Sequence, residues 1–257
     1  MGARIRIFVG VLICSGLVLY NARADELCTD ANDKWKAIDI MSGQYRISNN
    51  VWRGTTQQCL TVYPDSTYFS VIRSTHDLNN VAAYPCIIKG RHFGGDNTQN
   101  SGLPILVSDI ATAPVAWSVD VNGAGGVWNS AYESWFSKTG GTVPDAAELM
   151  IWINSKGGMK PRGTKVATVS IAGASWDVYY DTRSDWNYIA YKKVQPAPKI
   201  TFDLKDFIDD AISRGYIKTS WYLDSMEAGF EIMRDGQGLT NNSFSAAVTG
   251  RNGTKTN

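Results

Sequence analysis

The stretch Ala147-Glu148-Leu149-Met150-Ile151-Trp152-Ile153 decides the fold, because two kinds of side chain alternate along it. Aliphatic residues at 149, 151 and 153 alternate with a glutamate, a methionine and a tryptophan. A period of two is typical of a β-strand whose two faces have different surroundings. The aliphatic face predicts contact with a hydrophobic core. The face that carries Glu148 predicts the floor of a cleft, where a carboxylate beside an indole has a use.

Short apolar or aromatic runs recur on both sides of this stretch, roughly every eight to twelve residues, with turn residues between them. Such spacing predicts an all-β antiparallel sandwich. Strands are expected at residues 44–52, 59–63, 68–73, 103–107, 116–121, 128–136, 147–153, 166–171, 176–180, 186–193, 220–223, 227–233 and 243–248. Residues 93–102 and 157–163 are expected to be loops because they are rich in glycine and polar residues.

One segment follows a helical period instead. Apolar residues in 203–214 recur at positions 204, 207, 208, 211 and 212, and Gly215 follows as a stop signal. The pattern predicts a single helix packed on the outside of the sandwich.

The N-terminus has the features of a secretory signal peptide. Arg4 and Arg6 precede an apolar run at 7–20, and Ala22-Arg23-Ala24 fits an A-x-A cleavage site. Cleavage near Ala24 predicts a secreted protein, extracellular or periplasmic. No other apolar run is long enough to span a membrane. Residues 25–250 are then expected to form one large domain and residues 251–257 a polar tail, and we expect a monomer.

Charge excludes some partners. The formal net charge is +1 for the whole chain, and the signal peptide supplies three arginines and no acids, so the mature chain is near −2. Neither nucleic acid nor an anionic membrane is indicated. The chain has two histidines and no acidic calcium-loop pattern, so we expect no metal and no organic cofactor.

Three cysteines remain after the predicted cleavage. In an exported protein Cys28 and Cys59 are the natural pair, although sequence alone does not fix the pairing. Cys86, in an apolar run, is expected to be a small buried side chain.

A second glutamate repeats the pattern seen at Glu148. Phe230 and Ile232 alternate with Glu231, so this carboxylate also lies on a strand with an apolar opposite face. Two carboxylates on one sheet face, among nine tryptophans and twelve tyrosines, suit the cleavage of a glycosidic bond. One alternative is that both glutamates simply face solvent, as most strand glutamates do. Another is a non-catalytic carbohydrate-binding jelly roll, which would need neither glutamate.

Several motifs bear on this choice, because together they resemble glycoside hydrolase family 12. They are Glu148-Leu149-Met150-Ile151-Trp152, Gly229-Phe230-Glu231, Asn49-Asn50-Val51-Trp52, residues 79–85, residues 186–191 and residues 206–211. The resemblance covers about residues 26–248 and is greatest to the bacterial cellulases of the family. It implies a β-jelly-roll sandwich of two antiparallel sheets with a concave substrate cleft.

The resemblance also assigns roles. Glu148 matches the nucleophile and Glu231 the general acid/base, which implies a retaining mechanism. Glu133 stands where the family usually has an aspartate that hydrogen-bonds the nucleophile, so it is expected to be a supporting carboxylate. The matched substrate-binding positions are Asn50, Trp52, Trp35, His92 and Met150.

Structural roles remain open for several of these side chains. Trp52 and Trp35 also fit a structural role, although Val51 rather than Trp52 falls on the apolar face of its run. His92 also fits a loop. The same choice between packing and sugar contact applies to Trp135, Trp152 and Trp176, and His76 is expected to be superficial or structural.

The sequence departs from the family at four positions. Glu133 replaces the usual aspartate, and its extra methylene brings a carboxyl closer to Glu148, which predicts an altered pH dependence. Arg53 stands where the family usually has glycine. Met233 stands where an aromatic residue often follows the acid/base motif. Cys86 has no obvious disulfide partner. The implied activity is a secreted endo-β-1,4-glucanase acting on cellulose or a related β-glucan. Xyloglucan and mixed-linkage glucan are the alternative substrates.

Overall fold

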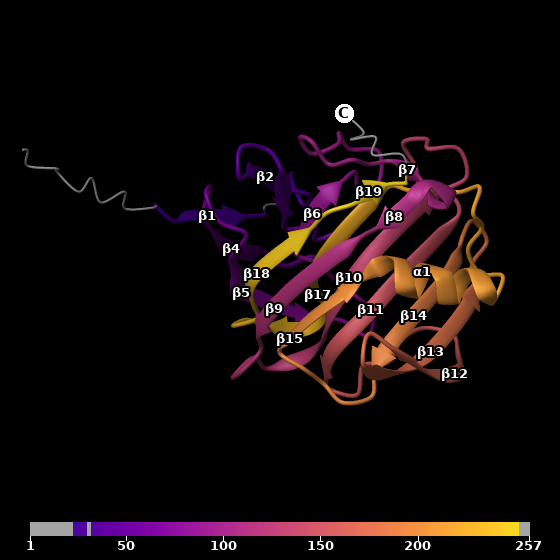
Figure 1. Ribbon diagram of the computed structural model, residues 1–257. Helices are drawn as coiled ribbons and strands as arrows, with labels where there is room; N and C mark the ends of the chain where they lie inside the picture. The colour runs from indigo at the N-terminus through magenta and orange to yellow at the C-terminus, as the bar shows by residue number, and fades with distance from the viewer. Residues whose placement is uncertain (1–22, 30–31, 252–257) are drawn as a thin grey trace, which may run out of the picture.

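The computed structural model describes residues 23–29 and 32–251, which fold into two stacked β-sheets and one helix (Figure 1). The predicted signal peptide, apart from Arg23 and Ala24, and the predicted tail beyond Arg251 lie outside the described residues.

The first sheet has six strands, and every pairing in it is antiparallel. Its strands, in spatial order, are β1 Asp25–Cys28, β4 Gln58–Val62, β5 Phe69–Asp77, β18 Thr240–Ala246, β9 Pro114–Asp120 and β15 Lys199–Asp203.

The second sheet is larger and contains the strands that the sequence analysis linked to catalysis. The nine strands of this sheet are, in spatial order, β2 Ala37–Ile40, β3 Tyr45–Ser48, β6 Cys86–Gly90, β17 Ser225–Gly236, β10 Gly126–Ser137, β11 Ala147–Lys156, β14 Asn187–Lys193, β13 Ala174–Thr182 and β12 Thr164–Ile171. Around these strands lie β7 Ile105–Leu106, β16 Tyr222–Leu223, the 3₁₀ turn Val107–Asp109, and the pair β8 Ile110–Thr112 with β19 Thr249–Gly250.

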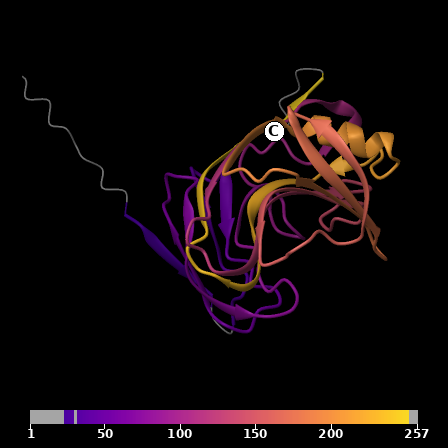
Figure 2. The ribbon, with the colours of Figure 1, turned by 90° about the horizontal axis from the view of Figure 1, so that it is seen from below.

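One pairing departs from the predicted antiparallel pattern, since β11 and β14 run parallel. Parallel neighbours need a long crossover, and the hairpin of β12 and β13 supplies it between them. The C-terminal end of β17 also pairs with β5, Arg234 opposite Asp77, and so joins the two sheets. The predicted jelly-roll sandwich is confirmed, with strands that bend strongly along their length (Figure 2).

The alternation along β11 separates two apolar clusters, as predicted. Leu149, Ile151 and Ile153 belong to the main core between the sheets, where Phe69 of the first sheet contacts Phe230 of the second with ring centroids 5.9 Å apart. Residues on the other face of the second sheet form a smaller cluster: Tyr84, Cys86, Ile88, Ala131, Met150, Trp152, Met159, Tyr188 and Ala190. This second cluster supports the cleft.

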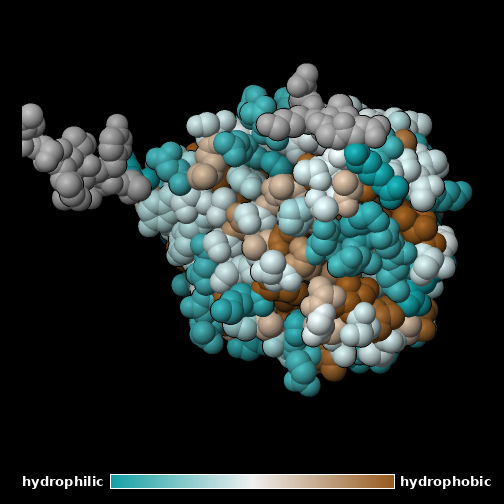
Figure 3. Space-filling model, viewed as in Figure 1, coloured by the Kyte–Doolittle hydropathy of each residue, from teal (hydrophilic) through white to brown (hydrophobic). Residues whose placement is uncertain are grey.

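The predicted helix is α1 Leu204–Ser213. Its N-cap Asp203 accepts a hydrogen bond from the backbone N–H of Lys205 at 2.9 Å. Phe207 packs edge-on against Trp176 of β13 and Tyr191 of β14, both at 5.1 Å. The first sheet ends at β15, so α1 completes the layer that covers β13 and β14 (Figure 1). The solvent side of the helix is mainly hydrophilic (Figure 3).

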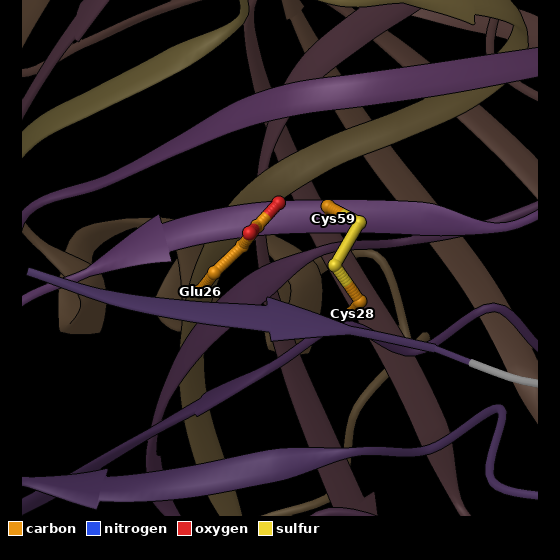
Figure 4. Close-up of side chains that lie close together, drawn as sticks. All are labelled: Glu26, Cys28 and Cys59. Atoms are coloured by element: carbon orange, nitrogen blue, oxygen red, sulfur yellow. A yellow bond between two sulfur atoms is a disulfide. The ribbon is translucent and has the colours of Figure 1, made fainter.

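The predicted disulfide is present and joins β1 to β4 (Figure 4). Cys28 and Cys59 stand directly opposite each other in the antiparallel pair. Glu26 points to the same side, and these three are the one group of potential metal ligands found close together in the described part of the chain. A disulfide leaves no thiolate to bind an ion, so we assign no metal site here. Cys86 is free and buried, as expected.

Some elements differ from the prediction. β2, β6 and β15 were not predicted, and β6 shows no alternation because all five of its residues are buried. The strand predicted at 44–52 ends at Ser48, after which the chain turns into a loop and Asn50 has a positive φ of 43°. No strand is predicted beyond residue 248, yet Thr249–Gly250 forms the short strand β19, which pairs with β8.

Gly229 allows β17 to approach β6 closely beneath the cleft. A Cβ added at Gly229 would meet the Pro85 carbonyl oxygen and would lie 2.8 Å from the Cα of Cys86. We expect Gly229→Ala to lower the free energy of unfolding by about 1–3 kcal/mol, because backbone atoms must move to admit the methyl group. Urea unfolding measures this loss. Gly141→Ala, whose new Cβ would make only an ordinary contact, is the control; equal stability of the two variants would contradict the prediction.

Candidate active site

A cavity of about 1370 Å³ lies on the face of the second sheet that points away from the main core. Seven of the eight predicted site residues line it: Trp35, Asn50, Trp52, His92, Glu133, Glu148 and Glu231. Met150 does not line the cavity. Its side chain is fully buried in the cluster below, where its sulfur accepts a hydrogen bond from Trp152 Nε1 at 3.5 Å. Met150 therefore supports the floor of this cleft.

Strand β10 brings the predicted carboxyl groups together, because it pairs with both β11 and β17. Glu148 on β11 stands opposite Trp135 of β10, and Glu231 on β17 stands opposite Asn129 of β10. Glu133 lies on β10 itself. The three glutamates belong to three adjacent strands, and all three side chains line one cleft.

Glu231 is held by Asn129. The Asn129 amide donates a hydrogen bond to Glu231 Oε2 at 2.5 Å, while its carbonyl oxygen accepts from the backbone N–H of Glu231 at 3.1 Å. These two bonds fix the orientation of the amide group. Burial raises the pKa of Glu231 to about 7, against the opposing effect of the Asn129 hydrogen bond.

Glu148 is held by Trp186, whose indole N–H donates to Glu148 Oε2 at 3.0 Å. Burial and the charge of Glu231 raise the pKa of Glu148 to about 8, and the Trp186 hydrogen bond opposes them, followed by the charges of Arg183 and Arg162. The sequence pattern predicts Trp186 on a strand, but its bond to Glu148 depends on the turn before β14.

Glu148 and Glu231 lose their protons as a coupled pair, because the charge on one disfavours charge on the other. Between the two ionisations the pair holds one proton and one negative charge. An indole N–H and two arginines favour the charge on Glu148, whereas Glu231 has a single neutral amide donor. These donors lower the pKa of Glu148, but it still lies at about 8, above the value of about 7 for Glu231, whereas a nucleophile and an acid need the reverse order.

Glu133 is buried beside this pair. Burial is the main cause that raises the pKa of Glu133 well above its ordinary value, and the charges of Glu148, Glu227 and Glu231 add to it. We therefore expect Glu133 to be protonated at neutral pH. The effect of the extra methylene on pH dependence stays a prediction.

Glu227 is a fourth buried carboxylate, which the sequence analysis did not identify. It stands opposite Glu133, and its Oε1 accepts a hydrogen bond from His92 Nδ1 at 3.0 Å. Burial lowers the pKa of His92, but the charge and hydrogen bond of Glu227 outweigh it, so the net shift is upward. Glu227, Gly229 and Glu231 alternate on one face of β17, and this alternation was the available signal.

Tryptophans lie along the cleft in different degrees of exposure. Trp35 is 57% exposed and Trp52 is 40% exposed, and both line the cavity while Val51 is buried, so a core role for Trp52 is wrong. Trp135 also lines the cavity, with its ring 5.5 Å from that of Trp186. Trp152 lines the floor, whereas Trp176 lies in the main core and is a packing residue.

Two buried polar atoms of cleft residues have no hydrogen-bond partner within residues 23–29 and 32–251. They are Asn50 Oδ1 and Trp135 Nε1, although the Trp135 indole lies near enough to Glu133 to oppose the rise in the pKa of that carboxyl. A buried polar group without a partner is costly, so such atoms suit a ligand that can satisfy them. The hydroxyl groups of a sugar can do so, because each can donate and accept.

A buried polar network holds the loop that carries Asn50 and Trp52. Asn49 donates to the backbone carbonyls of Leu27 and Gln58, at 2.8 and 2.9 Å. The Gln58 amide donates in return to Asn49 O and Oδ1, at 3.1 and 2.7 Å. The loop is thus tied to β1 and β4.

His76 completes this network and is buried, so of its two expected roles the structural one is correct. Because Gln58 uses its amide nitrogen as a donor to Asn49, its Oε1 is left to accept from His76 Nε2 at 3.1 Å. The proton is therefore on Nε2, and Nδ1 accepts from the Thr56 hydroxyl at 2.8 Å. Burial lowers the pKa of His76.

We expect His76→Gln to lower the free energy of unfolding by about 1 kcal/mol at pH 8, because a buried hydrogen bond is lost. Since the pKa of His76 is lowered in the folded state, its neutral form stabilises the protein above the unfolded value of 6.5, and that stability is lost as the pH falls below it. The free energy of unfolding, measured with urea, should fall less between pH 8 and pH 5 in the variant than in the wild type. An equal fall in both proteins would contradict a buried, neutral His76, because every other titrating group is the same in the two proteins.

We expect Trp186→Phe to move the acidic limb of the kcat/KM profile to higher pH. The substitution removes the N–H that stabilises charged Glu148, so its pKa rises further and the activity below the optimum falls about tenfold. Trp52→Phe is the matched control, because Trp52 lines the same cavity but its indole N–H makes no hydrogen bond to Glu148. An equal shift in both variants would contradict a role for the hydrogen bond.

The chain resembles known proteins both in sequence and in fold. The family model described as Glycosyl hydrolase family 12 matches residues 43–249. The solved structure of an endoglucanase from Rhodothermus marinus is 44% identical, has a TM-score of 0.84, and covers 88% of this chain and 99% of that one. Endoglucanase S of Pectobacterium parmentieri is 30% identical over 215 residues, which are 76% of this chain and 79% of that protein. A family 12 xyloglucanase from Bacillus licheniformis is 25% identical, with a TM-score of 0.74, 88% of this chain and 100% of that one.

Proposed function

The chain belongs to glycoside hydrolase family 12, and from that premise we propose that it is a secreted endo-β-1,4-glucanase with a retaining mechanism. It is a glycoside hydrolase whose substrate is a polysaccharide. The observation that carries the proposal is the placement of Glu148 and Glu231 on either side of β10, in one cleft lined by tryptophans.

In the first step, a Glu148 carboxylate oxygen attacks the anomeric carbon of the sugar on one side of the scissile bond. Glu231 gives its proton to the leaving glycosidic oxygen as the bond from carbon to oxygen breaks. The products are a covalent glycosyl ester on Glu148 and a released chain with a free hydroxyl. Two inversions at one carbon give net retention, so the ester is the intermediate that this mechanism requires.

In the second step, the Glu231 carboxylate removes a proton from water, and the water oxygen attacks the same carbon. The ester bond breaks, Glu148 regains its charge, and Glu231 regains its proton. The donors described above support these states. The Trp186 N–H stabilises charge on Glu148, and the Asn129 amide orients Glu231 toward the cleft.

Sugar units on either side of the bond are proposed to contact the aromatic side chains. Trp35 and Trp52 offer exposed indole surface, and Asn50 Oδ1 offers an acceptor for a hydroxyl group. His92, held by Glu227, lines the same cavity. Xyloglucan is a second candidate substrate, favoured by the likeness to a xyloglucanase of the same fold.

Residues 25–250 are proposed to be the catalytic domain, exported after removal of residues 1–24. The disulfide between Cys28 and Cys59 fits an oxidising compartment. No helix within the described residues has the length and apolar character needed to cross a membrane. We expect the mature domain to act as a monomer.

We expect Glu148→Ala to lower hydrolysis of soluble β-1,4-glucan to below about one-thousandth, and Glu231→Ala to lower kcat about 100- to 10,000-fold. Glu26→Gln, at an exposed position outside the cleft, is the control and should stay fully active. Proton NMR of the first product should show the β-anomer. A first product in the α-form would rule out the two-step mechanism, and full activity of Glu148→Ala would rule out its role.

A further inference from the structure

Two tryptophans of the cleft each carry an arginine on the ring. The guanidinium carbon of Arg53 lies 4.6 Å from the ring centroid of Trp52, and that of Arg183 lies 4.8 Å from the ring centroid of Trp186. All four residues line the cavity. Trp52 is a proposed sugar platform, and Trp186 donates a hydrogen bond to Glu148, so both arginines stand where a bound glucan would pass.

Neither guanidinium has an ion-pair partner or a side-chain hydrogen bond within the described residues. The other two arginines of the cavity differ in this respect. Arg46 pairs with Asp39 at 2.7 Å, and Arg162 pairs with Asp181 at 2.5 Å. Stacking on an indole holds a guanidinium plane in place and uses none of its N–H donors. The donors of Arg53 and Arg183 are therefore available to a ligand.

The charge of the cleft is divided between its floor and its rim. The carboxyl groups of Glu133, Glu148 and Glu231 at the floor have raised pKa values, so they keep protons near neutral pH. At the rim, Arg53, Arg183 and the exposed Lys160 are cations without a paired acid among the described residues. This local excess occurs in a mature chain whose net charge is near −2.

A neutral glucan gives these arginines no charged partner. A sugar ring and a guanidinium also compete for an indole face, so a neutral sugar that takes the face displaces the cation without compensation. A carboxylate on the sugar compensates it, because the planar guanidinium binds a carboxylate through two parallel hydrogen bonds.

We propose that the substrate of this cleft is a β-glucan that bears carboxylate groups, which Arg53 binds at the Trp52 platform and Arg183 binds beside Trp186. The proposal rests on the proposed glucanase function and names the chemical class of its substrate. It also gives a role to Arg53, whose guanidinium stacks on Trp52 without an ion-pair partner among the described residues.

Arg183 has a second effect that the test must separate, since its charge also lowers the pKa of Glu148. That effect acts on every substrate, whereas recognition of a carboxylate acts only on the charged one. The measured quantity is therefore the ratio of kcat/KM for carboxymethyl cellulose to kcat/KM for hydroxyethyl cellulose, with polymers of matched length and degree of substitution.

The experiment compares the wild-type protein with Arg53→Gln, Arg183→Gln and the double variant. We expect each single substitution to lower the ratio about three- to fivefold, the effect of one partly exposed charge pair, and the double variant about tenfold. The wild-type ratio should fall as NaCl is raised from 0.05 to 0.5 M. The Debye length then shortens to between about 3 and 8 Å, so the rim charges are screened. Lys218→Gln, which removes a cation stacked on Trp221 outside the cavity, should leave the ratio unchanged.

The outcomes separate the two proposals. If the wild type hydrolyses hydroxyethyl cellulose but the ratio is the same in all variants and at all salt concentrations, this inference is wrong and the glucanase function stands. If the variants lose activity equally on both polymers, the arginines act on catalysis and not on recognition, which also overturns the inference. A wild type that hydrolyses neither polymer overturns the glucanase function together with this inference.

Discussion

The crowding of four carboxyl groups on one sheet face is the constraint on which the rest of this structure depends. Glu133 and Glu227 are buried, and Glu148 and Glu231 are partly buried beside them, so all four lose hydration to different degrees in the folded protein. Burial raises the pKa values of Glu133, Glu148 and Glu231, and neighbouring carboxylates raise those of Glu133 and Glu148 further, so these three keep protons at a pH where free carboxyl groups have lost them. A site that needs one charged and one protonated glutamate can be built in this way, but only on a frame that does not relax.

Strand β10 provides that frame. It lies between β11 and β17 and fixes the register of both, so the positions of Glu148 and Glu231 follow from backbone pairing rather than from flexible loops. On its other face the sheet packs against the main core, and Gly229 lets β17 approach β6 at the floor of the cleft. Rigid strands hold reacting groups more accurately than loops do.

The polar groups around the carboxyls differentiate them. Trp186 and two arginines favour charge on Glu148, Asn129 orients Glu231, and Glu227 accepts its hydrogen bond from His92. The rim follows a different principle, because its arginines rest on indole rings and have no acid of their own. Floor and rim together make a cleft whose reactive centre keeps protons and whose entrance carries positive charge, a combination that bears on which polysaccharides it accepts.

The sequence by itself determined the sandwich, the helix and the strand faces that carry the two glutamates. Local alternation and turn residues encode these features, since the face of a strand is fixed by a period of two wherever one side is buried. It placed Met150 in the cleft and left Glu227 unnoticed, because alternation gives the face of a residue but not its depth below the surface. Only the tertiary structure decided that Trp186 bonds Glu148, that His76 is buried in the network under Trp52, and that Arg53 and Arg183 stack on indoles. These contacts join residues distant in the chain or depend on turn geometry, and neither is present in a local pattern.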